Sequence, residues 1–256
     1  MQQAVDARWL LHTGLSPMFP SDRYSRNQLL AALPGKALDF LVPHLEASIL
    51  KQDELIFEAG QIAVRAVFPG DCVLSVVTIM ADGRSAETAS IGREGCVGFV
   101  SGLGDRHVID RCIVQMDGSA TSVPLVWLNR AVERFPAVRD LQMRYFKAVF
   151  AHTLRSVACS SLHTIDLRCA RWLLMAHDRV QRDTFSIKQD DLAKMLGVRR
   201  SSVGQVCGEL QRVGIIRYSR GSITILDRAR LEAAACECYG AVQRIYQRVL
   251  PKRERG

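Results

Sequence analysis

The stretch from residue 192 to 214 carries the side chains best suited to chemistry with a polyanion. Two arginines, two serines and a glutamine follow one another closely, at Arg199, Arg200, Ser201, Ser202 and Gln205. Guanidinium, hydroxyl and amide groups are the donors that proteins use on phosphates and on base edges. Gly204 and Gly208 interrupt the same helical pattern, although each glycine costs about 1 kcal/mol relative to alanine inside a helix. We therefore expect DNA or a partner helix to approach this helix closely.

The surrounding pattern predicts the elements that position these side chains. Apolar residues at helical spacing indicate two short helices, at about 189–196 and 199–213, separated at Gly197. The side chains expected to face inward are Leu192, Met195, Leu196, Val203, Val206, Leu210 and Val213. Alternating apolar residues over 215–226 then predict a β-hairpin around a glycine turn. Helix, turn, helix and hairpin, in this order, define a winged helix-turn-helix.

A helix-turn-helix places the N-terminus of its second helix in the major groove of DNA. In that geometry Arg200 is the candidate for a guanine edge and Gln205 for an adenine edge. Arg199 is a poor helix cap, so we expect it to contact a phosphate, as Arg217 and Arg220 would. The alternative is a solvated helix with an incidental basic end. The full set of expected DNA-binding residues is Gln189, Arg199, Arg200, Ser201, Ser202, Gln205, Arg217 and Arg220.

The charge of the chain supports this interpretation. The 256 residues carry a formal net charge of +8. Residues 160–256 hold 18 Lys and Arg against 10 Asp and Glu, whereas residues 1–159 hold 16 of each, so the whole excess lies in the C-terminal part. Such asymmetry is typical of a polyanion-binding module joined to a neutral one. Because no apolar run is long enough to cross a bilayer and no signal-peptide pattern opens the chain, we expect no membrane partner and a cytoplasmic location.

The N-terminal part has a different organisation. Residues 1–25 show little periodicity, and residues 26–50 have a helical pattern with Leu29, Leu33, Leu38 and Leu41 on its apolar side. From residue 55 to 123, short apolar stretches such as 73–79 and 113–116 alternate with turn signals. This alternation predicts an antiparallel β sandwich or roll. The fold class expected is therefore α+β.

Residues 136–160 return to a helical period and carry two apolar stripes. One stripe holds Val138, Leu141, Tyr145, Ala148, His152 and Cys159, and the other holds Met143, Phe146, Phe150, Leu154 and Val157. A helix that is apolar on two sides must be covered on two sides. It is either a core helix of one subunit or a helix between its own domain and a twin helix. We expect a homodimer paired along Val138, Leu141, Tyr145, Ala148 and His152.

The C-terminal residues carry a resemblance to a known family. The run DDLAKMLGVRRSSV, followed by Leu210, Gly214 and the stretch RGSITILD, is similar to the Crp/Fnr superfamily of bacterial transcription regulators. This resemblance implies a β-roll sensor-like domain similar to cyclic-nucleotide-binding domains, a long dimerisation helix, a winged helix-turn-helix, and operator DNA and RNA polymerase as partners. The expected domains are a lead-in at 1–25, the β-roll at 26–124, the dimerisation helix region at 125–160, the DNA-binding domain at 161–230, and a C-terminal helix with a basic tail at 231–256.

The sequence departs from the family pattern in the sensor domain. Members that bind cyclic AMP resemble each other in a Gly-Glu pair and a later Arg-Ser/Thr pair. Here Gly98-Phe99 and Arg111-Cys112 stand at what look like those positions, and they mark the expected effector pocket. Phenylalanine cannot accept a hydrogen bond from a ribose hydroxyl, and Cys112 is only a weak donor. Arg111 would pair with another anion or with an internal carboxylate, so we expect DNA binding to be independent of cyclic AMP.

Cysteine and histidine are the residues of this chain that could ligate a transition metal. The eight cysteines show no regular framework, and iron–sulfur members of the superfamily resemble one another in clustered N-terminal cysteines that this chain lacks. Cys236 and Cys238 are close in sequence, but two neighbours on a helix would point to different sides. The six histidines have no mutual ligand spacing. We therefore expect no metal site and no cofactor.

The function expected is that of a sequence-specific transcription regulator that binds a pseudo-palindromic operator as a homodimer. One alternative is a regulator that responds to a cyclic nucleotide. Another is a cysteine-dependent enzyme with an accessory DNA-binding domain. The sequence contains no nucleophile elbow, P-loop, HExxH or paired-carboxylate motif, so we expect no catalytic residues.

Overall fold

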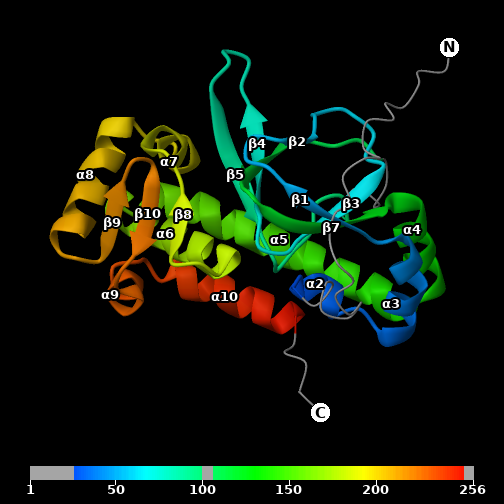
Figure 1. Ribbon diagram of the computed structural model, residues 1–256. Coiled ribbons are helices and arrows are strands. Elements are labelled where there is room, and N and C mark those ends of the chain that lie inside the picture. Colours follow the sequence, from blue (N-terminus) through cyan, green and yellow to red (C-terminus); the bar gives the residue numbers. More distant parts are fainter. Residues whose placement is uncertain (1–25, 100–105, 251–256) are drawn as a thin grey trace.

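The computed structural model describes residues 26–99 and 106–250, and the expected lead-in and basic tail lie outside these ranges. Figure 1 shows a β-rich region and a smaller mixed region at opposite ends of a long helix, α5. Each region has a hydrophobic core of its own, and Val73 and Met116 of the roll pack into the core of the smaller region. The α+β architecture expected from the sequence is confirmed.

The N-terminal region is a roll made of two antiparallel sheets. One sheet has the order β1-β7-β3 and the other has the order β2-β6-β4-β5. The strands are β1 (Glu46–Leu50), β2 (Leu55–Phe57), β3 (Arg65–Pro69), β4 (Val73–Ile79), β5 (Ser85–Ile91), β6 (Arg111–Met116) and β7 (Gly118–Pro124). The core between the sheets is closed by Phe57, Phe68, Leu74, Val114 and Val123, all of which are buried.

The segment before the roll differs from its prediction. A continuous helical pattern was expected over 26–50, but the structure has three short helical elements followed by a strand. These elements are α2 (Gln28–Ala31), α3 (Gly35–Leu41) and the 3-10 helix η1 (Val42–His44). Pro34 separates the first two because proline disfavours helix at the residue before it. Residues 46–50 are extended because each of them pairs with a residue of β7, between Gly118 and Ser122. Local periodicity does not reveal this long-range pairing.

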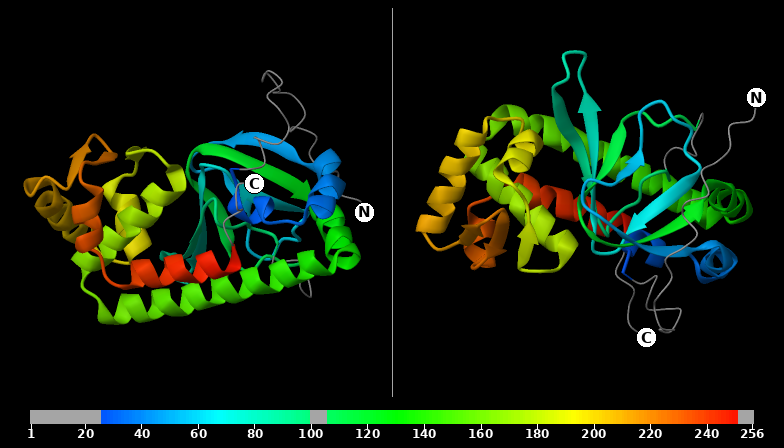
Figure 2. Two further views of the ribbon diagram at one scale, coloured as in Figure 1. Left: turned by 90° about the horizontal axis from the view of Figure 1, so that it is seen from below. Right: turned by 45° about the horizontal axis from the view of Figure 1, so that its top comes forward.

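Two helices connect the roll to the C-terminal region. They are α4 (Leu125–Arg134) and α5 (Pro136–Leu162), and α10 (Cys238–Val249) returns from the end of the chain to pack along α5. Figure 2 shows α10 lying beside the long helix over several turns. One stripe of α5 is therefore covered by the chain itself.

The dimer seam expected from the sequence is wrong for this reason. Val138, Leu141, Tyr145, Ala148 and His152 are all less than a tenth exposed, and they face the chain's own roll, α6 and α10. The other stripe, Met143, Phe146, Phe150, Leu154 and Val157, is between 40% and 63% exposed. Both stripes are apolar, so periodicity alone could not tell which one the chain would bury.

The C-terminal region is a winged helix-turn-helix. Its elements are α6 (Ile165–Val180), β8 (Thr184–Ser186), α7 (Gln189–Leu196), α8 (Arg200–Arg212), β9 (Ile216–Ser219), β10 (Ser222–Ile225) and α9 (Arg228–Ala233). The three strands form an antiparallel sheet in the order β8-β10-β9. The hairpin was expected, but β8 was not, because three residues in a short break carry no period. Leu192, Leu196, Val203 and Leu210 are buried as predicted, Met195, Val206 and Val213 are half-buried, and Cys207 is also buried.

The two regions touch through a buried ion pair. The guanidinium of Arg179 on α6 lies 2.8 Å from the carboxylate of Glu94, and it also donates to the hydroxyl and backbone oxygen of Ser90. The indole of Trp172 donates to Glu87 on β5 at 3.4 Å. These contacts hold the winged helix-turn-helix against the roll. Within the described part of the chain, no helix has the length and apolar character needed to span a bilayer.

Candidate nucleic-acid interface and neighbouring sites

The first turns of α8 present the predicted polar side chains to solvent. Arg199, Arg200, Ser201 and Gln205 are exposed, while Ser202 and Gln189, the first residue of α7, are half-buried. Turn geometry explains this arrangement, because Gly197 ends α7 in the left-handed conformation with φ +64°. The chain then enters α8 with its N-terminus directed outward. Six of the eight predicted DNA-binding residues thus lie on or beside one helix end.

Arg199 occupies the N-cap position of α8 and makes no capping hydrogen bond through its side chain. Its backbone carbonyl instead accepts from the amide of Ser202 at 3.1 Å. The guanidinium is left in solvent, and the first amides of the helix keep the partial positive charge of a helix N-terminus. Both features favour an anion at this position.

Arg200 has a partner within the helix-turn-helix. Its Nη1 lies 3.4 Å from Oδ2 of Asp190 on α7, and both side chains are more than half exposed. An exposed pair of this kind contributes at most about 1 kcal/mol, since water screens it. Arg200 can therefore leave Asp190 for a stronger ligand at little cost.

The two glycines of α8 have no role in packing against the chain itself. A Cβ at Gly208 would meet nothing within 4 Å, and a Cβ at Gly204 would lie 3.6 Å from Oε1 of Gln189, which is an ordinary contact. Alanine would therefore fit at both positions and would favour the helix. The open space above Gly208 fits the sequence-based expectation that an external surface approaches here.

The wing supplies the last two predicted residues. Arg217 is exposed on β9, opposite Thr224 of β10, and Arg220 and Gly221 form the two-residue turn between the strands. Both turn residues have positive φ, 49° and 78°, as a tight hairpin turn with the twist of the strands requires. Arginine is an unusual residue in this conformation. Its presence keeps a positive charge at the tip of the wing.

Two residues of the expected effector pocket, Phe99 and Cys112, are buried in the core of the roll. Phe99 is 1% exposed, and its ring packs between Phe68 and Tyr145. Cys112 is buried within β6, where burial raises the pKa of its thiol to about 12. The backbone at Gly98 is left-handed with φ +86°, close to the carbonyl of Arg65. The pocket expected at these positions is therefore wrong, because core packing fills the space.

Arg111 makes the internal ion pair that was one of its two expected roles. Its Nε and Nη2 atoms donate to the carboxylate of Glu58 at 2.7–3.1 Å. Both side chains are 41% exposed, so the pair lies at the surface of the roll. The hydrogen bond from Arg111 holds the pKa of Glu58 below its usual value, so the carboxylate remains charged at neutral pH.

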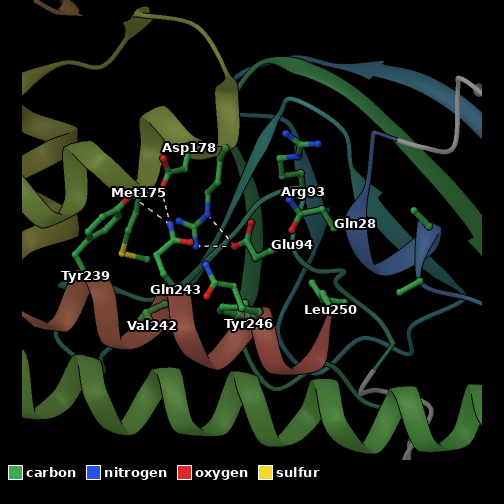
Figure 3. A pocket seen from close by; sticks show the side chains of 14 residues that line it. Gln28, Arg93, Glu94, Met175, Asp178, Tyr239, Val242, Gln243, Tyr246 and Leu250 are labelled. Carbon is green, nitrogen blue, oxygen red and sulfur yellow. Dashed lines mark hydrogen bonds and ion pairs between the residues drawn. The ribbon is translucent and has the colours of Figure 1, made fainter. Parts of the chain in front are cut away.

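A cavity does lie at another place in the structure, between the roll and the C-terminal helices. It measures about 470 Å³ and lies where residues 93–94 of the roll meet α6 and α10 (Figure 3). Asp178 on its wall accepts hydrogen bonds from Tyr239, Gln243 and Arg228 at 2.5–2.7 Å. A second cavity of about 200 Å³ lies between the strands of the roll and α7, and Arg111 lines it. Neither cavity is lined by Gly98, Phe99 or Cys112.

The buried thiols of the roll are poor nucleophiles. Burial raises the pKa of Cys72 to about 12 and raises the pKa of Cys96 well above its ordinary value. A thiol needs a lowered pKa and access to substrate in order to attack it. These cysteines therefore serve as core residues.

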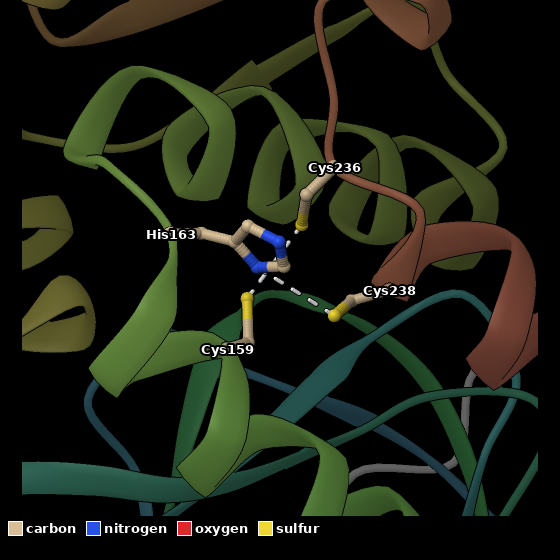
Figure 4. Close-up of side chains that lie close together, drawn as sticks. All are labelled: Cys159, His163, Cys236 and Cys238. Carbon is tan, nitrogen blue, oxygen red and sulfur yellow. Dashed lines mark hydrogen bonds between the residues drawn. The ribbon is translucent and has the colours of Figure 1, made fainter.

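Sequence reasoning missed one group of side chains. The structure brings Cys159, His163, Cys236 and Cys238 together near the junction of α5 and α6 (Figure 4). The expectation that Cys236 and Cys238 would point apart is wrong, because Cys236 precedes α10 and only Cys238 belongs to the helix. Cys159 and His163 were separated from them by more than 70 residues of sequence. The only local sequence signal for this group of side chains was the spacing of four residues between Cys159 and His163.

The fold is that of a winged helix-turn-helix joined to a β-roll domain. A family model described as a Crp-like helix-turn-helix domain matches residues 167–234. The resemblance expected for the C-terminal residues is therefore confirmed for this domain, since residues 167–234 match a Crp-like helix-turn-helix. A search of curated protein sequences gives no match.

Three solved structures illustrate the shared fold. A protein assigned to the Crp/Fnr family from Eubacterium rectale is 17% identical, covers 82% of this chain and 98% of its own, and has a TM-score of 0.62. FixK2 from Bradyrhizobium japonicum is 17% identical, covers 75% and 98%, and has a TM-score of 0.59. The c-di-GMP-responsive regulator CLP from Xanthomonas campestris is 14% identical, covers 75% and 99%, and has a TM-score of 0.56. At these identities the likeness concerns the fold.

Proposed function

We propose that the protein is a sequence-specific transcription regulator that binds operator DNA through α8 and the wing. The observation that carries this proposal is the exposed polar N-terminus of α8 within a Crp-like helix-turn-helix domain. Arg200 and Gln205 project from the first two turns, where a recognition helix contacts base edges. Arg200 is assigned to a guanine and Gln205 to an adenine, because these pairings satisfy two hydrogen bonds each.

The phosphate contacts are assigned to the residues around this helix. Arg199 at the N-cap, Arg217 on β9 and Arg220 at the tip of the wing are exposed and carry positive charge. Ser201, Ser202 and Gln189 complete the polar surface. Phosphate contacts of this kind set affinity and orientation, whereas base contacts set sequence preference.

The active species is proposed to be a homodimer formed along the exposed stripe of α5. Met143, Phe146, Phe150, Leu154 and Val157 lie on one side of the helix, and the rings of Phe146 and Phe150 stack at 6.4 Å. A second copy of this helix is the partner that fits, since two such stripes make the seam of a coiled coil. Two recognition helices about 34 Å apart would then read a pseudo-palindrome.

DNA binding is proposed to be independent of cyclic AMP. Phe99 fills the space beside Phe68 and Tyr145, and Arg111 is engaged by Glu58. A nucleotide phosphate would have to displace that carboxylate, and a ribose would find no acceptor at Phe99. Calorimetry with cyclic AMP should show no saturable binding in the micromolar range. The two alternatives, a cyclic-nucleotide-responsive regulator and an enzyme, gain no support from the described residues.

By family resemblance, the protein would act in the cytoplasm together with RNA polymerase. The experiment that tests the proposed function is selection from a random duplex library, followed by sequencing of the bound fraction. We expect an enriched pseudo-palindrome whose half-sites are one helical turn apart. Recovery of unenriched, random duplexes would contradict the proposal.

A further inference from the structure

Three thiols and one imidazole converge where the end of α5 meets the start of α10 (Figure 4). Their potential ligand atoms all lie within 4.8 Å of one another. Sγ of Cys159 is 3.6 Å from Sγ of Cys236, and Sγ of Cys238 is 3.8 Å from Nδ1 of His163. We propose that Cys159, His163, Cys236 and Cys238 bind a single Zn²⁺ ion.

The distances fit the geometry of such an ion. Zinc–sulfur bonds of about 2.3 Å and zinc–nitrogen bonds of about 2.0–2.1 Å, in a tetrahedron, place the ligand atoms roughly 3.5–3.8 Å apart. The two distances given above, 3.6 and 3.8 Å, fall within or at the edge of this range. Small side-chain rotations would bring the ligand atoms that lie up to 4.8 Å apart to the same separation. An iron–sulfur cluster would hold its cysteines farther apart, because several metal atoms lie between them. The set of ligands therefore suits one ion, and three thiolates with an imidazole suit zinc.

Each ligand is placed by its local backbone. Cys159 lies in the last turn of α5, and His163, four residues later, is the C-cap whose backbone amide still donates to the carbonyl of Cys159 at 3.1 Å. Cys236 lies in the irregular segment before α10, Glu237 is the N-cap and Cys238 is the first helical residue. This change of conformation between Cys236 and Cys238 turns both thiols toward α5.

The cluster is set apart from the hydrophobic cores of both regions. Cys159, Cys236 and Cys238 are 1–5% exposed, and Leu167 is the apolar side chain packed against them. A buried cysteine used only for packing lies among aliphatic and aromatic side chains, as Cys72 does in the roll. Three sulfurs that lie close to one another and to an imidazole are instead typical of a metal site.

The imidazole is oriented by a carboxylate. Nε2 of His163 lies 3.2 Å from Oε2 of Glu237, whose side chain is 71% exposed. When Nε2–H donates to Glu237, Nδ1 carries the lone pair that faces the sulfurs. A carboxylate that fixes the tautomer of a metal-binding histidine in this way increases the metal affinity of the site. Glu237 is thus a positioning residue that does not itself touch the ion.

The site would be structural, because four protein ligands leave no position open for substrate. Its place in the fold gives it a specific consequence. His163 is the C-cap of α5, and Thr164, the next residue, is the N-cap of α6. An ion bound here ties the C-terminal helix to the joint between the long helix and the DNA-binding domain. This assignment of the site does not depend on the proposed DNA-binding function.

The test uses the full chain, purified under reducing conditions and analysed for metal by plasma mass spectrometry. We expect one zinc per chain in the wild type and in Cys72→Ala, a control variant that removes a buried thiol from the roll. Cys238→Ser and His163→Asn should lose most of the bound zinc. Circular dichroism establishes that each variant is folded. Titration with Co²⁺ should give the thiolate-to-metal charge-transfer band of a tetrahedral site in the wild type and should give none in Cys238→Ser.

Glu237→Gln provides a test that does not disturb a ligand or the buried core. Competition with a chromogenic chelator should show metal binding about 10–100-fold weaker than in the wild type. The proposed site would be overturned if the wild type contained no zinc. It would also be overturned if Cys238→Ser and His163→Asn both kept the zinc content of the wild type. An intact mass lacking two hydrogens in reduced preparations, with Cys159 linked to Cys236, would also overturn it. Unchanged affinity in Glu237→Gln would overturn the positioning role of that residue.

Discussion

The guanidinium of Arg200 and the carboxylate of Asp190 form an ion pair of 3.4 Å between the two helices of the helix-turn-helix. The same guanidinium is the one proposed to contact a guanine. An acidic side chain therefore lies beside the group that is proposed to contact a base. This negative charge opposes the approach of phosphates and competes for Arg200.

The first prediction concerns this pair. Asp190→Asn removes the competing charge, and we expect DNA to bind about fivefold more tightly, which corresponds to about 1 kcal/mol. Glu209→Gln is the matched control, because Glu209 is exposed on α8 but pairs with Arg212 near the other end of the helix. Fluorescence anisotropy at constant ionic strength measures both. An equal gain from the two substitutions would show that only net charge matters and that Asp190 has no special relation to Arg200.

The second prediction concerns the wing. Arg220→Asn preserves the left-handed turn, since asparagine adopts that conformation readily, but it removes the charge. Binding should weaken on all sequences alike, and the slope of log K against log salt concentration should fall by about 0.9 for one lost phosphate contact. Arg212→Ala is the control, because it removes the same charge from the far end of α8. If both variants keep the wild-type slope, Arg220 contacts no phosphate.

The third prediction concerns the exposed stripe of α5. Phe150→Glu places a charge in the proposed seam, so the homodimer should dissociate to a 28.5 kDa monomer at micromolar concentration in sedimentation experiments. Arg155→Glu, an exposed change on the flank of the same helix, should leave the dimer intact. A monomeric wild type, with or without DNA, would refute dimerisation through this face.

The fourth prediction concerns pH. Burial, together with the charges of Arg179 and Arg171, lowers the pKa of His152 from 6.5 to about 3. The groups that face its ring are the hydroxyl of Tyr246 on α10 and Arg171 on α6, each at 3.4 Å. Below pH 6.5 the unfolded chain binds a proton at this histidine that the folded chain does not bind. The free energy of unfolding should therefore fall as the solution is acidified from pH 6.5 toward 3.

For one group the slope of this loss approaches about 1.4 kcal/mol per pH unit. His152→Gln should remove that contribution between pH 6 and pH 5, as measured by urea unfolding. If His152→Gln retains the full slope, another group causes it.

The DNA-binding domain could be predicted closely from the sequence because its signals are local. Gly197 and the buried positions Leu192, Leu196, Val203 and Leu210 fall in a short window with one period, and the turn at Gly221 follows directly. The strand β8 escaped prediction because it has three residues and is defined by pairing with β10, about 40 positions later.

Long-range packing decided the features that sequence reasoning got wrong. A periodicity analysis cannot distinguish the two apolar stripes of α5. Only the fold shows that the stripe containing Tyr145 is buried by the roll and α10. Phe99 was placed in an expected pocket, but its burial against Tyr145 depends on a residue 46 positions away. The four potential zinc ligands come together for the same reason, since α10 folds back onto the end of α5.

The most direct test of the central claim, sequence-specific DNA binding through α8, is the ratio of two affinities. The selected duplex and a scrambled duplex of equal length and composition are titrated with the protein at one physiological salt concentration. We predict that the selected duplex binds at least about 10³-fold more tightly, and that Arg200→Ala reduces this ratio by about 10–100-fold. Equal affinity of the wild type for the two duplexes would contradict the account.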